Sequence, residues 1–86
     1  MASYKIKFAT SVRKDFRKIP KKDATRILKR IEGLGDNPRP PLSKKLTGDD
    51  AMRIRIGNYR VIYEIRDDIL LVLVLRVGNR KNIYQK

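Results

Sequence analysis

Three arginines flank a Gly-Asn dipeptide at positions 57–58, and their spacing is suited to binding an anion. Apolar and mostly charged side chains alternate on either side of this dipeptide, as in a β-hairpin. A two-residue turn there would place Arg55 directly opposite Arg60, with Arg53 further along the same face. Like charges that face each other across a sheet destabilise it, so folding alone does not explain this arrangement. We therefore expect an anionic ligand at this cationic face.

The other face of the same hairpin is apolar. Gly57 takes the first position of the turn, as type II′ requires, and the facing apolar pairs are then Ile56 with Tyr59, Ile54 with Val61, and Met52 with Tyr63. Both tyrosines are expected in the core with their hydroxyls hydrogen-bonded. Glu64 falls on the cationic face and is expected to pair with a neighbouring arginine, and a role as a carboxylate base is the alternative.

Further cations lie in segments that the fold could bring to the hairpin. Lys44 and Lys45 lie within a proline-rich loop that we expect to bring them toward the hairpin. The chain closes on a basic tail with Arg80, Lys81 and one aromatic residue, Tyr84. This combination is typical of nucleic-acid binding, because the ring can stack on a base while the cations hold phosphates.

The composition favours a polyanionic partner and excludes several kinds of catalysis. The 86 residues include 22 Lys and Arg against 9 Asp and Glu, a net charge of +13. This excess points to nucleic acid first and an anionic membrane second, and a merely soluble basic surface is the alternative. Cysteine and histidine are absent, which excludes disulfides, thiolate nucleophiles, imidazole acid-base pairs and the usual zinc sites. We expect no metal and no cofactor, so any catalysis must use Lys, Arg, Tyr or carboxylates.

Periodicity and chain breakers indicate the elements that would position these residues. They are a strand over Tyr4–Phe8, a helix from Thr10 or Ser11 that stops at Pro20, a second helix from Pro20 to Gly33 or Gly35, a loop over Asp36–Asp50, the hairpin, and a strand over Ile69–Val77. The last strand is almost wholly apolar, ends at Gly78, and is expected to be buried on both faces in the middle of the sheet. The order predicts an α+β fold with two helices on one face of a small, mainly antiparallel sheet.

The chain length allows a single small domain, 1–86. The longest apolar run, Ile69–Leu75, is too short to span a bilayer, and the first residues lack the apolar segment of a signal peptide. We therefore expect a soluble, cytoplasmic protein with no membrane partner.

Several segments, taken in order, resemble the RelE branch of the RelE/ParE toxin superfamily. They are Lys45-Leu46-Thr47-Gly48, the hairpin Arg-Ile-Arg-Ile-Gly-Asn-Tyr-Arg-Val-Ile-Tyr-Glu that begins at Arg53, and the closing Val77-Gly78-Asn79-Arg80. The resemblance covers most of the chain and implies a RelE-like fold. It also implies the toxin of a type II toxin-antitoxin system. Such a toxin is a metal-independent, ribosome-dependent endoribonuclease that cleaves mRNA in the A site by 2′-hydroxyl attack on the adjacent phosphate, which inhibits translation. The implied partners are a RelB-like antitoxin, bound in a hetero-oligomer, and the ribosome with its mRNA.

By motif position, the resemblance implies a set of five catalytic residues, Arg53, Arg55, Arg60, Arg80 and Tyr84. Arg55 and Arg60 would neutralise the charge that builds on the phosphorane. Arg80 would lie by the leaving 5′-oxygen, and Tyr84 would stack on or orient the cut nucleotide. Lys44, Lys45 and Lys81 are expected to bind the RNA. Removing one of two facing cations relieves repulsion, so Arg60→Ala is expected to lose cleavage while stability holds or rises slightly.

Two departures from the family pattern leave the general base open. Some relatives carry lysines at the positions of Arg53 and Arg55. A guanidinium is a poor base because its pKa exceeds about 12. Many relatives also carry a histidine where this chain has Asn79. The candidates for the base are Lys81, Lys45, Tyr84, a ribosomal group or hydroxide.

Two other function classes remain open. A ParE-type toxin shares the fold but poisons DNA gyrase, and the four arginines of the site argue against it. A non-catalytic RNA-binding protein, such as a ribosomal protein, is what composition alone would favour.

Overall fold

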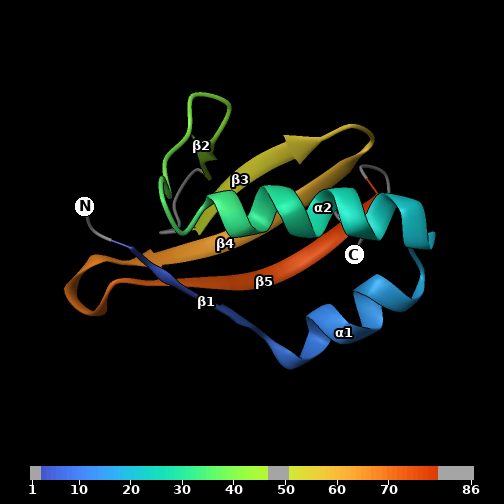
Figure 1. The fold of residues 1–86 in the computed structure, drawn as a ribbon, viewed down its shortest axis with the longest axis horizontal. Coiled ribbons are helices and arrows are strands. Elements are labelled where there is room, and N and C mark those ends of the chain that lie inside the picture. Colours follow the sequence, from blue (N-terminus) through green and yellow to red (C-terminus); the bar gives the residue numbers. More distant parts are fainter. Residues whose placement is uncertain (1–2, 47–50, 80–86) are drawn as a thin grey trace.

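Two helices and five strands make up the part of the chain that the computed structural model describes, residues 3–46 and 51–79. In chain order they are β1 (Lys5–Phe8), α1 (Thr10–Arg17), α2 (Lys21–Gly33), β2 (Lys44–Lys45), β3 (Ala51–Ile56), β4 (Tyr59–Arg66), the 3-10 turn η1 (Asp67–Ile69) and β5 (Leu71–Asn79). The helices pack against a mostly antiparallel sheet, which confirms the predicted α+β class (Figure 1). The short strand β2 lies inside the segment that was expected to be a loop.

The strands are arranged in the order β1-β5-β4-β3-β2, so β4 lies in the centre of the sheet. β1 runs parallel to β5, whereas every other neighbouring pair is antiparallel. The first described strand therefore lies beside the last, although the two are far apart in the sequence. β5 has a strand on each side of it, but the central strand is β4 and not β5, which had been predicted in the middle of the sheet.

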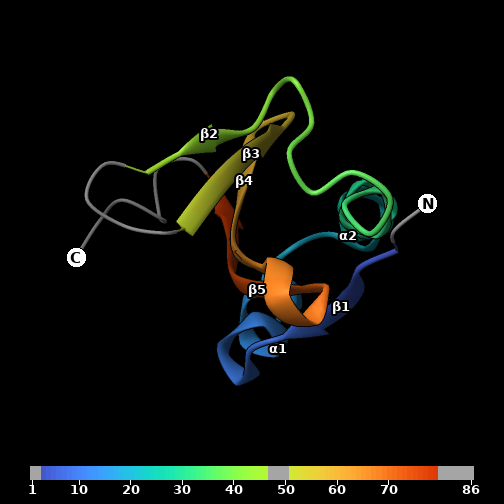
Figure 2. The ribbon, with the colours of Figure 1, turned by 90° about the vertical axis from the view of Figure 1, so that its left-hand side faces the viewer.

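Both helices contribute to one apolar core, which lies between α2 and the sheet. Figure 2 shows α2 end-on, beside one face of the sheet. The core includes Val12 of α1, Ile27 and Ile31 of α2, and Ile54 and Val61 of the hairpin. Burying apolar side chains of this size stabilises the fold by about 1.5–3 kcal/mol each. No helix within the described residues is long and apolar enough to cross a bilayer.

The hairpin of β3 and β4 has the predicted register. Arg55 pairs with Arg60, Ile56 with Tyr59 and Met52 with Tyr63, as the alternation requires. Gly57 has a φ of 59°, a left-handed conformation that glycine adopts without a steric penalty. The type II′ turn therefore explains why glycine stands at the first position of the loop.

The two tyrosines of this hairpin point into the core, as expected. Tyr63 is fully buried, and its hydroxyl donates a hydrogen bond of 2.8 Å to the carbonyl oxygen of Pro38. Tyr59 is half-buried and donates a bond of 2.9 Å to Asp23 Oδ2. Both hydroxyls are therefore satisfied within the protein.

The last strand differs from its prediction in its boundaries and burial. β5 begins at Leu71 and runs through Gly78 to Asn79, whereas Ile69 lies in η1 with 63% of its surface exposed. An apolar run alone does not distinguish a strand from an exposed turn that precedes it. The register with β4 shifts between Ile62 and Tyr63, which pair with Arg76 and Val74. This bulge leaves one extra residue on β5, so the strand does not follow a simple alternation.

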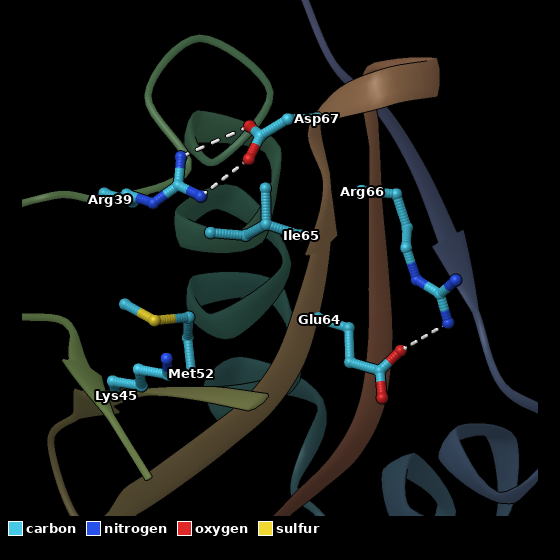
Figure 3. Close-up of a pocket in the computed structure, with 7 residues that line it drawn as sticks. All are labelled: Arg39, Lys45, Met52, Glu64, Ile65, Arg66 and Asp67. Carbon is cyan, nitrogen blue, oxygen red and sulfur yellow. Dashed lines mark hydrogen bonds and ion pairs between the residues drawn. The ribbon is translucent and has the colours of Figure 1, made fainter. Parts of the chain in front are cut away.

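A polar network fastens the turn η1 to the start of β1. The hydroxyl of Tyr4 donates a bond of 2.6 Å to Asp67 Oδ1. Arg39 Nη2 lies 2.8 Å from Asp67 Oδ2, and both atoms are drawn in Figure 3. These bonds from Arg39 and Tyr4 lower the pKa of the Asp67 carboxyl.

We expect this network to stabilise the fold at neutral pH, and we expect that stabilisation to be lost in acid. A carboxyl whose pKa is lower in the folded than in the unfolded protein stabilises the fold fully above its unfolded pKa of about 4. This stabilisation disappears as the pH falls through the folded pKa. Asp67→Asn should therefore lower the free energy of urea unfolding near neutral pH and flatten its fall in acid. Asp68→Asn, which removes the same charge one residue later, is the control. Identical pH profiles for the two variants would contradict a stabilising role for Asp67.

Candidate active site

Four cations meet on the sheet face that points away from the helices, and we call them the arginine face: Lys44, Arg53, Arg55 and Arg60. In an antiparallel sheet, directly paired residues share a face. Lys44 of β2 pairs with Arg53 of β3, and Arg55 of β3 pairs with Arg60 of β4. Ile54 and Ile56, which alternate with the arginines of β3, are buried in the core on the opposite side. The structure thus brings together three of the five predicted catalytic residues and one of the predicted RNA-binding lysines.

The arginine face is compact enough to hold one phosphate and its neighbours. Strands lie about 4.8 Å apart and successive residues on one face about 7 Å apart. Side chains paired directly across two strands have Cβ atoms about 5 Å apart, so the Arg55 and Arg60 guanidinium groups can reach the same anion. Arg53 and Lys44 form the next row and can contact an adjoining phosphate.

Arg60 is much less accessible than the hairpin pattern implies. Only 5% of its surface is exposed, whereas Arg55 is exposed and Arg53 is half-buried. On its other side Arg60 pairs with Gly78 of β5, which has no side chain. A cation held in a partly dehydrated position interacts more strongly with a nearby anion than one in water. Arg60 is therefore suited to stabilising charge that develops at one fixed point.

The burial of Arg60 corrects the expectation that Arg60→Ala would leave stability unchanged or higher. The long apolar stem of an arginine packs like a hydrophobic side chain, and removing it costs contacts. The relief of repulsion with Arg55 is worth at most about 1 kcal/mol. We now expect the alanine variant to be less stable than the wild type.

Lys45 lies on the face opposite to Lys44. It pairs with Met52, which in turn pairs with the buried Tyr63. Figure 3 shows Lys45 and Met52 on one side of β4. Both line a cavity of about 480 Å³ at the end of the hairpin away from its turn. Lys45 is therefore separated from the arginine face by the thickness of the sheet.

Glu64 pairs with an arginine, as predicted, and lies far from the centre of the arginine face. Its Oε1 accepts a bond of 2.9 Å from Arg66 Nη2 (Figure 3). Glu64 follows Arg60 along β4 by about 13 Å, which is beyond the reach of a phosphate held by Arg55 and Arg60. This distance does not suit Glu64 to the role of general base at that phosphate.

The described tyrosines do not suit that role either. The pKa of Tyr59 is raised, first by the hydrogen bond to Asp23, and the pKa of Tyr4 is raised by its bond to Asp67. Burial raises the pKa of Tyr63. All three phenols therefore stay protonated at neutral pH and donate their hydrogen bonds inside the protein. Within the described ranges, no group of acidic side chains could hold a metal ion.

The remaining predicted site residues, Arg80, Lys81 and Tyr84, lie outside the described residues. The description of β5 ends at Asn79, and the two residues at its end, Gly78 and Asn79, pair with Arg60 and Tyr59.

Two carboxylates on the helices accept hydrogen bonds from the strands of the site, and the sequence analysis did not predict either of them. Asp15 of α1 accepts a bond of 3.0 Å from the backbone N–H of Val77, and Arg76 Nε lies 3.4 Å from the same oxygen. Asp23 of α2 accepts the bond from Tyr59. Both carboxylates stand in basic, amphipathic helices, where an acidic residue gives no sign of a distant partner.

The chain is similar to known proteins in both sequence and fold. Residues 6–84 match the family described as the ParE toxin of the type II toxin-antitoxin system, parDE. Toxin RelG of Mycobacterium tuberculosis is 34% identical to this chain over 91 residues, which cover 96% of this chain and 98% of RelG.

Solved structures agree with the sequence comparison. A chain of the RelBE2 toxin-antitoxin complex of M. tuberculosis superposes with a TM-score of 0.82 at 28% identity, covering 91% of this chain and 99% of that chain. A chain of the archaeal RelE-RelB complex of Pyrococcus horikoshii gives a TM-score of 0.78 at 29% identity, covering 93% and 98%. The resemblance to RelE toxins that the hairpin indicated is thereby confirmed. The chain therefore belongs to the ParE toxin family of type II toxin-antitoxin systems, and within that family it is a RelE-like toxin.

Proposed function

We propose that this toxin is a metal-independent endoribonuclease that cleaves mRNA in the ribosomal A site and so inhibits translation. The observation that carries the proposal is the pairing of Arg55 with Arg60 across the hairpin, with Arg60 almost fully buried. Two facing cations cost folding free energy, and a bound phosphate would remove that cost. RNA supplies such phosphates, and the net charge of +13 favours its approach.

In this reaction, a ribose 2′-hydroxyl attacks the adjacent phosphorus and the 5′-oxygen of the next nucleotide leaves. The products are a 2′,3′-cyclic phosphate and a 5′-hydroxyl, so one proton leaves the nucleophile and one reaches the leaving oxygen. Arg55 and Arg60 would stabilise the negative charge of the phosphorane, while Arg53 and Lys44 would hold the flanking backbone. Donors fixed in this way are commonly worth about 10²–10³ in rate each.

Residues outside the described ranges would complete the site. We propose that Arg80 neutralises charge on the leaving oxygen, that Tyr84 stacks on the cut nucleotide and that Lys81 contacts RNA. The base that accepts the first proton stays open, with Lys81, Tyr84, a ribosomal group and hydroxide as candidates. Lys45 is a weaker candidate, because it lies on the other face of the sheet.

We also propose that a RelB-like antitoxin binds this chain in a hetero-oligomer in the cytoplasm. The support is that the related structures from M. tuberculosis and P. horikoshii are complexes of RelE-type proteins with RelB-type proteins.

A gyrase-poisoning toxin is the second candidate, favoured by the ParE name of the matched family. The arginine face favours the ribonuclease, because two facing arginines suit a phosphate on which negative charge develops.

Induction of the chain in growing cells tests the proposal. We expect incorporation of labelled methionine to stop within minutes while incorporation of thymidine continues, and we expect co-expression of the cognate antitoxin to prevent the arrest. Arrest of DNA synthesis with continued translation would support the gyrase reading instead. Continued growth at a high level of folded protein would contradict both toxin readings.

A further inference from the structure

The tip of the hairpin is attached to α2 by side chains that do not belong to the arginine face. Tyr59, the first residue after the turn, points toward α2, and its hydroxyl donates a bond of 2.9 Å to Asp23 Oδ2. Asp23 lies in the first turn of α2. The bond joins residues 36 positions apart, so it links two separate elements.

A second contact joins the same two elements. Arg26 follows Asp23 by three residues and so lies on the same side of α2. A Cβ atom built on Gly57 would lie only 2.7 Å from Arg26 Nη2, which shows how closely this guanidinium approaches the turn. We refer to Asp23, Arg26, Gly57 and Tyr59 together as the turn clamp.

The turn clamp lies next to the two facing arginines of the hairpin. Only one residue pair, Ile56 with Tyr59, separates the turn from Arg55 and Arg60. Ends and turns of hairpins are the parts that open most easily, and facing cations favour opening. The clamp opposes that opening from the far side of the sheet, where it does not compete with a ligand.

We propose that Tyr59 and Asp23 are positioning residues, which hold Arg55 and Arg60 at the spacing needed to stabilise the reacting phosphate. This inference rests on the proposed ribonuclease function. The bond from Tyr59 raises its own pKa, so the phenol remains a donor rather than a base. Binding of RNA needs the cations to be present, whereas catalysis also needs their spacing, so loss of the clamp should affect the two differently.

The test compares Tyr59→Phe with Tyr4→Phe. Each removes one hydroxyl that donates to a carboxylate, at 2.9 Å in Tyr59 and 2.6 Å in Tyr4, but Tyr4 bonds to Asp67 at the far end of β4. We expect Tyr59→Phe to lower the single-turnover cleavage rate on programmed ribosomes by about tenfold or more, because small misplacements of catalytic groups are costly. Its dissociation constant for ribosomes should stay within about twofold. Tyr4→Phe should change neither quantity.

Substitutions at Asp23 provide an independent check. Asp23→Asn keeps an oxygen that accepts the bond and should retain most of the cleavage activity. Asp23→Ala removes that oxygen and should lower the cleavage rate as much as Tyr59→Phe does. The double variant Tyr59→Phe with Asp23→Ala should be no slower than either single variant, because both remove the same interaction. Additive losses would show that the two residues act separately and would overturn the clamp.

Amide hydrogen exchange across residues 54–61 separates failure of the inference from failure of the proposed function. We expect the hairpin amides to exchange about tenfold faster in Tyr59→Phe than in the wild type, and no change in Tyr4→Phe. If the wild type cuts no mRNA, the proposed function is wrong and the exchange data alone decide whether the clamp holds the hairpin. If the two phenylalanine variants behave alike in exchange and cleavage, the inference is wrong.

Discussion

Arg60→Met is expected to lower the single-turnover rate of mRNA cleavage by about 10²–10³ while the protein remains folded. Methionine keeps an unbranched apolar side chain in a position where only 5% of the surface is exposed, but it removes the charge. The variant should therefore unfold at nearly the same urea concentration as the wild type. Cleavage on programmed ribosomes and urea unfolding, measured on the same preparation, check both parts of the prediction.

The matched variant Arg60→Ala separates charge from packing. It should be as inactive as Arg60→Met and less stable by about 1–3 kcal/mol, because the packing of the stem is lost as well. An active methionine variant would show that Arg60 has no role in the reaction. A methionine variant that fails to fold would assign Arg60 to the structure alone.

Arg55→Ala should lower cleavage by a similar factor, about 10²–10³, without any loss of stability. Arg55 is exposed and directly faces Arg60, so its removal relieves a repulsion worth at most about 1 kcal/mol and leaves no cavity. Arg66→Ala is the control, since Arg66 is an exposed arginine further along the neighbouring strand that pairs with Glu64. Equal activity in the two variants would mean that total charge, and not the facing pair, drives the reaction.

The hairpin could be predicted from the sequence because each of its determinants is local. Alternation fixes which residues share a face, and Gly57 fixes the turn and hence the register. The same reasoning could not predict how deeply each side chain is buried. Alternation shows which face a residue lies on, but not how much of that face is covered by other parts of the protein. Arg55 and Arg60 occupy facing positions, yet one is exposed and the other is buried.

Features that depend on distant contacts could not be predicted. Asp15 and Asp23 bond to residues 62 and 36 positions away, and nothing near them in the chain indicates those partners. The bulge opposite Ile62 and Tyr63 also depends on how two strands meet. The position of Lys45 could not be read from the loop, since the two-residue strand β2 decides which of two adjacent lysines joins the arginine face.

We propose that the arginine face acts on mRNA within the ribosome. The most direct test incubates the purified toxin with a defined mRNA, with and without ribosomes stalled so that a codon occupies the A site, and maps the new ends by primer extension. We predict cleavage within the A-site codon only when ribosomes are present, with a cyclic phosphate on the upstream fragment, and none with Arg60→Met. Efficient cutting of free mRNA, or no cutting by the wild type on ribosomes to which it binds, would contradict the claim.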